Sequence, residues 1–185
     1  MANRIFIATE LFQPLIAVMQ DLQGEWRQRM QGTYVRWVRF DCMHLTFHFL
    51  GDVPGTQVAS LSTLLPKTLS GLSPEPVVLS NLEAFPTARQ ATVLMCRIED
   101  SSGKLLQQIY DRVAAMLVRQ GIRIKQRAWH PHLTLGRLPV PAVVDTSWYQ
   151  PGPLAWFVSS VSLMSSTLGP GGPTYHTIKV VPLEK

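Results

Sequence analysis

Several features of common protein classes are scarce in or absent from this chain of 185 residues. The two cysteines, Cys42 and Cys96, are too few for a disulfide framework and lack metal-ligand spacing, which fits a reducing compartment. No apolar stretch approaches the roughly 20 residues that span a bilayer. Glu10 interrupts the short apolar run near the start, and no small-residue cleavage site follows it. We therefore expect a cytoplasmic protein with no membrane contact.

Charge is also sparse, since Asp, Glu, Lys and Arg make up 16% of the chain, and no segment has low complexity or a long run of one sign. Hydrophobic residues account for 46%, which is enough for a sizeable core and predicts a single folded unit over residues 1–185. The net charge is +5 and the pI is about 9.6. A basic balance favours polyanionic partners slightly, although many basic proteins bind none.

Two related motifs are present. Residues 44–51 read HLTFHFLG and residues 130–137 read HPHLTLGR, so His-Leu-Thr occurs twice, 88 residues apart. At this composition, chance supplies only about 0.04 copies of the tripeptide. The apolar alternation predicts that each motif lies on a strand. Alternation then gives two sets of polar side chains, each on one face: His44, Thr46 and His48, and His130, His132 and Thr134.

The segments around the motifs repeat as well. Residues 3–9 and 91–98 favour strands, and each run is followed by apolar residues at helical spacing, from Pro14 to Met30 and after Ser102. Ser101 or Ser102 is the candidate N-cap of the second helix, and Gly121 its stop. The other patterns predict strands at 35–38, 76–85, 156–166 and 174–183, a helix at 58–69 and an extended surface crossing at 139–153.

The order strand, helix, motif strand thus occurs twice. It predicts an α+β fold of two pseudo-twofold-related lobes, each an antiparallel sheet with helices on the outside. An internal twofold would bring the two motif strands together in the middle, with their histidines facing a central cleft.

Two imidazoles facing one cleft suit a reaction that removes one proton and supplies another, because an unperturbed pKa of about 6.5 allows either protonation state near neutral pH. Threonine hydroxyls on the same faces can donate hydrogen bonds to phosphate oxygens. An arginine three residues further on can offer bidentate donors to a phosphoryl group. The candidate site residues are His44 and His132 for acid–base catalysis, Thr46, Thr134 and Arg137 for phosphate binding, and His48 and His130 as auxiliaries.

Other chemistries have less support. The four motif histidines could together bind zinc, with Asp41 and Asp52 flanking the first strand, but the spacing matches no familiar zinc site. We expect no metal and no cofactor. There is no G-x-S-x-G, and neither cysteine sits in a recognisable nucleophile setting.

The motifs carry a resemblance to a known family. Beyond HLTF and HLTL, the matching segments are RIFIA near the start, VRWV before the first motif, FLGDV after it, AFPTARQATVL in the middle and SSTLGPGGPTYHTI near the end. Over nearly its full length the sequence resembles the 2H phosphoesterases, in particular the LigT-like RNA 2′,3′-cyclic phosphodiesterases (ThpR). The resemblance implies a bilobal fold with both motifs in a central cleft and no metal requirement.

The resemblance also implies an activity. Family members open a 2′,3′-cyclic phosphate at an RNA 3′ end to leave a 2′-phosphate, and some catalyse reversible 2′,5′ joining of RNA ends. On this sequence, the resemblance makes His44 the proton donor to the departing 3′ oxygen and His132 the base that activates water. Thr46 and Thr134 would hold phosphate oxygens, and Arg137 would occupy the family's basic position. We expect a monomer that acts on RNA with cyclic phosphate ends.

Two positions depart from the family pattern, and two alternative functions stay open. Met95 stands where relatives commonly have Trp, and His48 where Lys or a small residue is more usual. The first alternative is a non-catalytic RNA-end or nucleotide-binding module, in which Trp37 and Phe47 could stack on bases. The second is a phosphodiesterase for a small cyclic nucleotide, an ADP-ribose cyclic phosphate or a 2′,5′-linked oligonucleotide.

Overall fold

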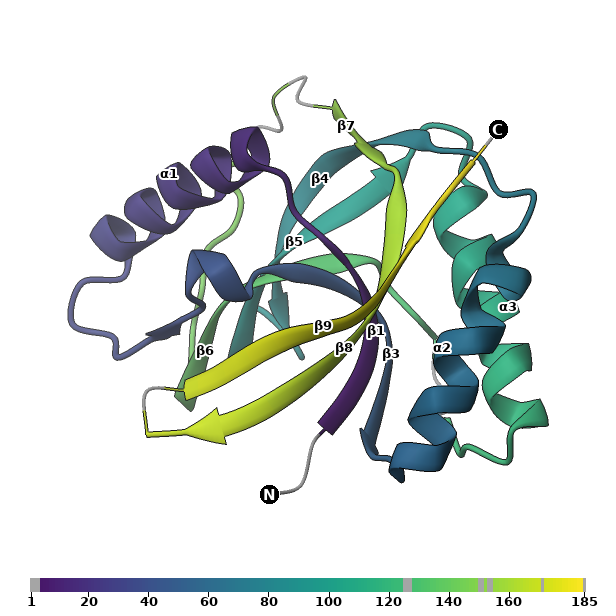
Figure 1. Cartoon of the computed structure of the whole chain (residues 1–185). Coiled ribbons are helices and arrows are strands. Elements are labelled where there is room, and N and C mark those ends of the chain that lie inside the picture. The colour runs from purple at the N-terminus through teal and green to yellow at the C-terminus, as the bar shows by residue number, and fades with distance from the viewer. Residues whose placement is uncertain (1–3, 125–127, 150–151, 153–154, 171, 185) are drawn as a thin grey trace.

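The computed structural model describes residues 4–124, 128–149, 152, 155–170 and 172–184 (Figure 1). Its elements, in chain order, are β1 (Arg4–Glu10), α1 (Gln13–Arg29), β2 (Arg36–Trp37), the 3-10 turn η1 (Phe40–Cys42), β3 (His44–Asp52), α2 (Gly55–Leu69), β4 (Glu75–Phe85), β5 (Ala91–Asp100), α3 (Leu105–Arg119), β6 (His132–Ala142), β7 (Ala155–Val158), β8 (Ser160–Gly169) and β9 (Gly172–Pro182). Within these ranges, no helix combines the length and the apolar character needed to cross a membrane.

The strands form an antiparallel sheet in the order β7-β4-β5-β6-β3-β1-β8-β9, with β2 added to β6. The motif strands β3 and β6 lie at its middle, and β1 and β5, the strands that start each repeat, flank them. We call β3, β1, β8 and β9 the first lobe, and β6, β5, β4 and β7 the second lobe. The predicted α+β fold of two antiparallel lobes with helices outside is confirmed.

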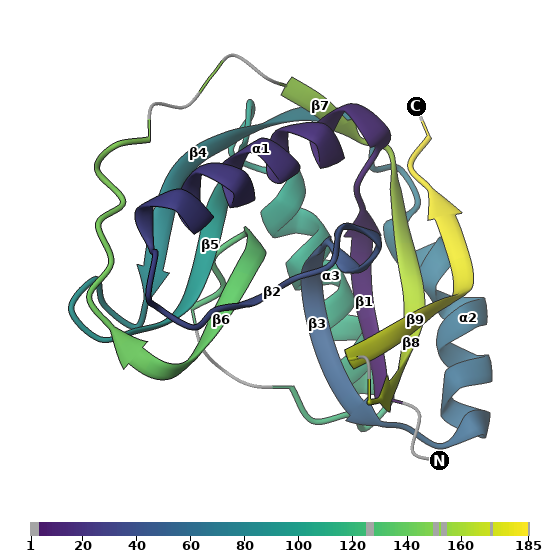
Figure 2. The same ribbon diagram turned by 90° about the vertical axis from the view of Figure 1, so that its left-hand side faces the viewer.

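Each lobe is covered by a helix that follows a strand of the other lobe. The chain leaves β1 of the first lobe and enters α1, which lies over β4, β5 and β6 of the second (Figures 1 and 2). It leaves β5 of the second lobe and enters α3, which packs on β3 of the first and lies beside α2. This exchange of helices joins the two lobes through one core.

The core is built from the apolar helical faces that the sequence predicts. In α1, Leu15, Met19, Leu22 and Trp26 are buried, with Pro14 in the first turn, where its missing N–H costs no hydrogen bond. Burying a side chain of this size contributes about 1.5–3 kcal/mol. The buried residues of α2 and α3 are Leu61, Leu65 and Leu69, and Leu105, Leu106, Ile109, Val113, Met116 and Leu117.

The segment from 156 to 166, expected as one strand, is two strands that belong to different lobes. β7 pairs with β4, whereas β8, which begins at Ser160, pairs with β1 and β9. The chain therefore passes from the second lobe to the first at Ser159. Continuous β-propensity carries no signal for this change of partner, because each half of the run is a good strand by itself.

Two smaller expectations also need correction. The crossing predicted at 139–153 begins later, because β6 continues to Ala142, which pairs with Ala91. Helix α3 starts at Leu105, so neither serine is its N-cap. The Asp100 carboxylate instead accepts the Leu106 N–H at 2.7 Å. An acidic group suits this helix end because the first-turn N–H groups have no intrahelical partner.

Candidate active site

The two motif strands are joined by an antiparallel pair of equivalent residues. Leu45 of β3 lies opposite Leu133 of β6, and the two are 88 residues apart, as are the motifs themselves. Both leucine side chains are buried, with 1% and 0% exposure. Since side chains alternate along a strand, the His and Thr on either side of each leucine point to the other face. The pair thus places both His-x-Thr sets on one surface of the sheet.

A cavity of about 970 Å³ opens on that surface. Six of the seven predicted residues line it, all but His130: His44, Thr46, His48, His132, Thr134 and Arg137. Its charged lining residues, as far as the structure describes the chain, are Arg36, Arg39 and Arg137, with no Asp or Glu among them. The cavity therefore favours an anionic ligand.

A β-bulge interrupts the alternation of β3 directly after the first motif. Ala8 of β1 pairs with Thr46, but the preceding Ile7 pairs with His48. One step along β1 thus spans two residues of β3, and Phe47 is the extra residue. The bulge moves His48 to the face of Ile7, which is directed at the core.

The expectation that His48 shares a face with His44 is therefore wrong. Although His48 borders the cavity, its side chain is only 5% exposed and stacks on Tyr110 of α3, with ring centroids 4.2 Å apart. Its Nε2 lies 2.9 Å from the Tyr110 carbonyl oxygen. Phe49 continues the face of His44 instead, because both rings contact Phe6, with centroids at 6.2 and 4.9 Å.

The same bulge occurs in the second motif strand. Met95 of β5 pairs with Thr134, whereas Leu94 pairs with Gly136, so Leu135 is the extra residue. Without this bulge, the residue three positions after Thr134 would point away from the cavity. With it, Arg137 comes to the same side as the second motif and lines the cavity.

Gly136 has no room for a side chain. A Cβ at this position would lie 2.7 Å from Cγ1 of Val35 and 3.1 Å from the Trp37 ring. Here β2 packs closely on the bulge, with Trp37 paired to Gly136. The glycine after the second motif is thus explained by the close approach of β2.

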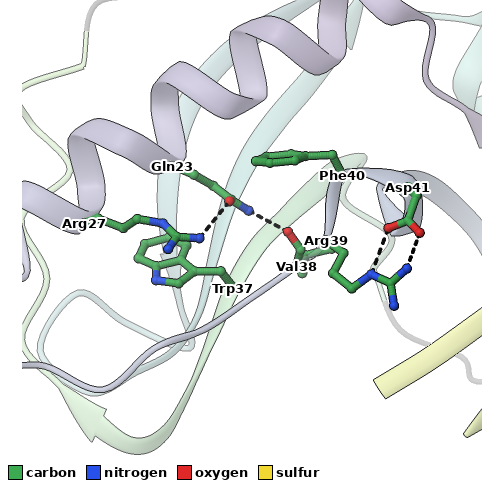
Figure 3. A pocket seen from close by; sticks show the side chains of 7 residues that line it. All are labelled: Gln23, Arg27, Trp37, Val38, Arg39, Phe40 and Asp41. Carbon is green, nitrogen blue, oxygen red and sulfur yellow. Dashed lines mark hydrogen bonds and ion pairs between the residues drawn. The ribbon is translucent and has the colours of Figure 1, made fainter. Parts of the chain in front are cut away.

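Gln23 of α1 bonds the second bulge and the Val38 carbonyl oxygen beside it; Figure 3 shows the bond to Val38. This side chain is 1% exposed, and its Nε2 donates to the carbonyl oxygens of Leu135, at 2.9 Å, and Val38, at 2.8 Å. It borders a smaller cavity of about 360 Å³, where the Arg27 guanidinium lies over the Trp37 ring at 5.0 Å. Sequence reasoning missed Gln23, although a lone amide on the apolar face of an amphipathic helix was an available signal.

The two motif histidines are oriented by equivalent hydrogen bonds. Nδ1 of His44 lies 2.9 Å from the Cys42 carbonyl oxygen, and Nδ1 of His132 lies 2.7 Å from that of His130. A carbonyl only accepts, so Nδ1 is the donor in each ring. This tautomer makes Nε2 the nitrogen that exchanges a proton with a ligand.

His130 contributes to this arrangement through its backbone. The predicted strand position of its side chain is wrong, because β6 begins at His132. Its exposed ring lies near Arg97, with Nδ1 at 3.4 Å from Nη1. The carbonyl of His130, rather than its imidazole, therefore reaches the site through His132.

Burial lowers the pKa of His44 below its usual value. The bond to the Cys42 carbonyl opposes this shift, whereas the positive charges of His132 and Arg137 add to it. The Phe6 and Tyr175 rings pack against the imidazole, with centroids at 4.9 and 5.1 Å. These surroundings therefore favour neutral His44, and an anion bound beside it would favour its protonated form.

The four motif histidines do not all converge on one point. His48 faces α3 and His130 precedes its strand, so neither joins His44 and His132. Within the described ranges, no three His, Cys, Asp or Glu side chains form a group that could hold a metal ion.

Comparisons with known proteins place this chain. Residues 13–95, which include the first motif, match the family model of LigT-like phosphoesterases. An RNA 2′,3′-cyclic phosphodiesterase of Methanothermobacter thermautotrophicus is 27% identical, over 97% of this chain and 98% of that protein. This chain is similar in sequence to the LigT-like phosphoesterases.

Further relatives agree in sequence and fold. An RNA 2′,3′-cyclic phosphodiesterase of Bacillus subtilis is 28% identical, over 57% of this chain and 56% of that protein. The crystal structure of TT0787 from Thermus thermophilus superposes with a TM-score of 0.80 at 25% identity, covering 97% of each chain. Escherichia coli LigT in complex with 3′-AMP gives 0.73 at 21% identity, covering 100% of each chain, and shares the fold.

Proposed function

We propose that this protein hydrolyses 2′,3′-cyclic phosphodiester ends of RNA to 2′-phosphomonoesters, without a metal ion. The observation that carries the proposal is the convergence of two His-x-Thr sets and Arg137 on one cavity that no carboxylate borders in the described part of the chain. The names of the relatives support the substrate, because two proteins that match this chain are named RNA 2′,3′-cyclic phosphodiesterases.

In this proposal, the two histidines transfer protons at opposite ends of one displacement. Nε2 of His132 accepts a proton from water as the water oxygen attacks phosphorus. The bond from phosphorus to the 3′ oxygen breaks, and Nε2 of His44 protonates the departing oxygen. The product is a 2′-phosphomonoester with a free 3′-hydroxyl. Hydrolysis leaves the proton on His132, and exchange with solvent resets both rings.

The other three residues bind the phosphate. The hydroxyls of Thr46 and Thr134 donate to its non-bridging oxygens, and Arg137 offers two parallel N–H groups. These donors gain most when negative charge accumulates in the transition state. The anionic substrate also favours protonated His44, whose pKa is otherwise lowered by burial and by neighbouring positive charge.

Ligation uses the same groups. A 5′-hydroxyl of a second RNA that replaces water would attack the same phosphorus, release the 3′ oxygen and leave a 2′,5′ phosphodiester. We include this reversible joining in the proposal as a secondary reaction.

We further propose that residues 1–185 form a single bilobal domain that acts as a monomer, because both motif strands come from the same chain. A cytoplasmic location fits the two cysteines, Cys42 and Cys96, which are free and buried.

The test is turnover of an oligonucleotide that ends in a 2′,3′-cyclic phosphate, by purified protein in EDTA. A 2′-phosphate product is expected, with a bell-shaped dependence of rate on pH. A 3′-phosphate product contradicts the proposed cleavage of the bond to the 3′ oxygen, and a rate that is flat between about pH 5 and 9 contradicts paired imidazole catalysis. Binding of the oligonucleotide without turnover would favour the non-catalytic module instead.

A further inference from the structure

Arg36 and Arg137 lie directly opposite each other without a carboxylate between them. Arg36 of β2 pairs with Arg137 of β6, both are exposed, and both line the cavity. Side chains directly opposite in an antiparallel pair have Cβ atoms about 4.5–5.5 Å apart, so two like charges there repel. Neighbouring arginines do have acidic partners, since Arg39 bonds Asp41 and Arg97 is paired with glutamates.

In the part of the chain that the structure describes, neither Arg36 nor Arg137 makes an ion pair. An anion in the cavity would remove the repulsion between them. Arg137 is already assigned to the reacting phosphate, together with a threonine from each lobe. Arg36 lies on a further strand and supplies a second positive charge beside that site.

An exposed aromatic residue accompanies Arg36. Tyr34 is 70% exposed and lines the same cavity. Between them, Val35 is buried against the position of Gly136. Tyr34 and Arg36 thus point to the same side, away from Val35. A cation and an aromatic ring along one groove are the usual components of a site for single-stranded nucleic acid.

The backbone directly after Arg36 is held by hydrogen bonds and packing. The N–H of Val38 donates to the Leu135 carbonyl oxygen at 3.0 Å, and the Val38 carbonyl accepts from Gln23 at 2.8 Å. The Arg27 guanidinium covers the Trp37 ring, as Figure 3 shows. Side chains on a fixed backbone lose less freedom when a ligand binds.

We propose that Tyr34 and Arg36 form a subsite for the RNA that precedes the cyclic phosphate. Arg36 binds the 5′ phosphodiester of the terminal nucleotide, and Tyr34 stacks on the base before it. The inference rests on the proposed function and narrows its substrate class to the ends of RNA oligonucleotides, in preference to cyclic mononucleotides.

The experiment compares two substrates that end in the same nucleotide. One is a nucleoside 2′,3′-cyclic phosphate without a 5′ phosphate, and the other is a trinucleotide with a 2′,3′-cyclic phosphate end. Arg36→Ala should lower kcat/KM for the trinucleotide by about tenfold, since a bond to a charged group is lost, and leave the mononucleotide within about twofold. Tyr34→Ala should also reduce kcat/KM for the trinucleotide only.

The salt dependence of kcat/KM is a second test of the contact between Arg36 and a phosphate. The slope of log kcat/KM against log salt for the trinucleotide should be shallower by about 0.7 in Arg36→Ala, as expected when one phosphate contact to a single strand is lost. Arg119→Ala is the matched control, because Arg119 is an exposed arginine in the last turn of α3 and does not border the cavity.

Two results overturn the subsite. Equal loss on both substrates would assign Arg36 to the reacting phosphate, and equal turnover by wild type and Arg36→Ala would leave Arg36 without a role. Failure of wild type on both substrates contradicts the proposed function instead. In that case, binding of the trinucleotide 2′-phosphate still tests the subsite, and equal affinity of wild type and Arg36→Ala overturns it.

Discussion

The two motif strands share a His, a Thr and a bulge, and they differ at the next residue on the cavity face. That residue is Phe49 in the first lobe and Arg137 in the second. Around Phe49 the wall is aromatic, with the Phe6 and Tyr175 rings 5.1 Å apart. Around Arg137 it is cationic, with Arg36 directly opposite. A pseudo-symmetric fold thus forms an asymmetric cavity.

The residues inside the two bulges differ for a packing reason. His48 has space on the core side of the sheet, where it stacks on Tyr110 and bonds its carbonyl oxygen. Gly136, its equivalent, has β2 pressed against it. In β3, the bulge therefore lets His48 contact α3. In β6, the equivalent glycine leaves room for β2, the strand that carries Arg36. The difference between His48 and Gly136 thus lies on the core side of the sheet. It changes the cavity because β2, which packs on Gly136, carries Arg36.

The largest loss of activity is expected from substitution of the motif histidines, which the two lobes share. His44→Ala and His132→Ala should each lower kcat by about 10²–10⁴, because each removes one of two proton transfers. Turnover of a cyclic phosphate oligonucleotide by each variant is the measurement. His176→Ala, at an exposed position on β9, is the control. Near-wild-type turnover by either motif variant would mean that only one lobe takes part in catalysis.

The next largest effect is expected at Arg137 and Phe49, the equivalent positions at which the two lobes differ. Arg137→Ala should lower kcat by about 10²–10³, since a donor to developing phosphoryl charge is lost. Phe49→Ala removes a ring that is 60% exposed and should act mainly on KM, by a few fold. The kcat and KM values of the two variants on one substrate test this. If both variants change only KM, the two walls do not differ in chemistry, and the asymmetry concerns binding alone.

Local patterns predicted most of the fold. The alternation in 44–51 and the helical spacing in α1 are local consequences of burial, and the 88-residue repeat predicted the pairing of β3 with β6. The change of lobe at Ser159 was not predictable, because it depends on which partner strand is available. Strand partners are set by tertiary packing, which propensity does not report.

In the candidate site, too, local patterns predicted the residues but not the arrangement that depends on tertiary packing. The residue types and the repeat indicated His44, His132 and both threonines, and these line the cavity. The face of His48 was predicted wrongly, because a bulge shifts every later side chain to the other face. Such a bulge depends on groups distant in sequence. The Leu135 carbonyl, for example, accepts from the Val38 N–H and from Gln23, which lies 112 residues away.

A stability effect should follow from that bond. Gln23→Leu keeps the approximate volume of the side chain but removes the Gln23 donor from the Val38 carbonyl oxygen and leaves the Leu135 carbonyl oxygen with the Val38 N–H alone, which costs about 1–3 kcal/mol. Urea unfolding measures the loss. Gln20→Leu, on the exposed face of the same helix, should stay within about 0.5 kcal/mol of wild type. Equal stabilities of the two variants would show that the bulge persists without its anchor.

The smallest effect is a change in the pKa of one imidazole caused by the opposite lobe. NMR titration should find His44 below its usual pKa in the free protein, because burial and the positive charges of His132 and Arg137 disfavour its protonated form. Arg137→Met removes one of those charges and should raise the pKa, whereas Arg119→Met should not change it. Bound 2′-AMP should raise it as well, since its phosphate adds negative charge beside the ring. If neither Arg137→Met nor the phosphate moves the titration, the cationic wall does not act on His44, and the two lobes are coupled through the substrate alone.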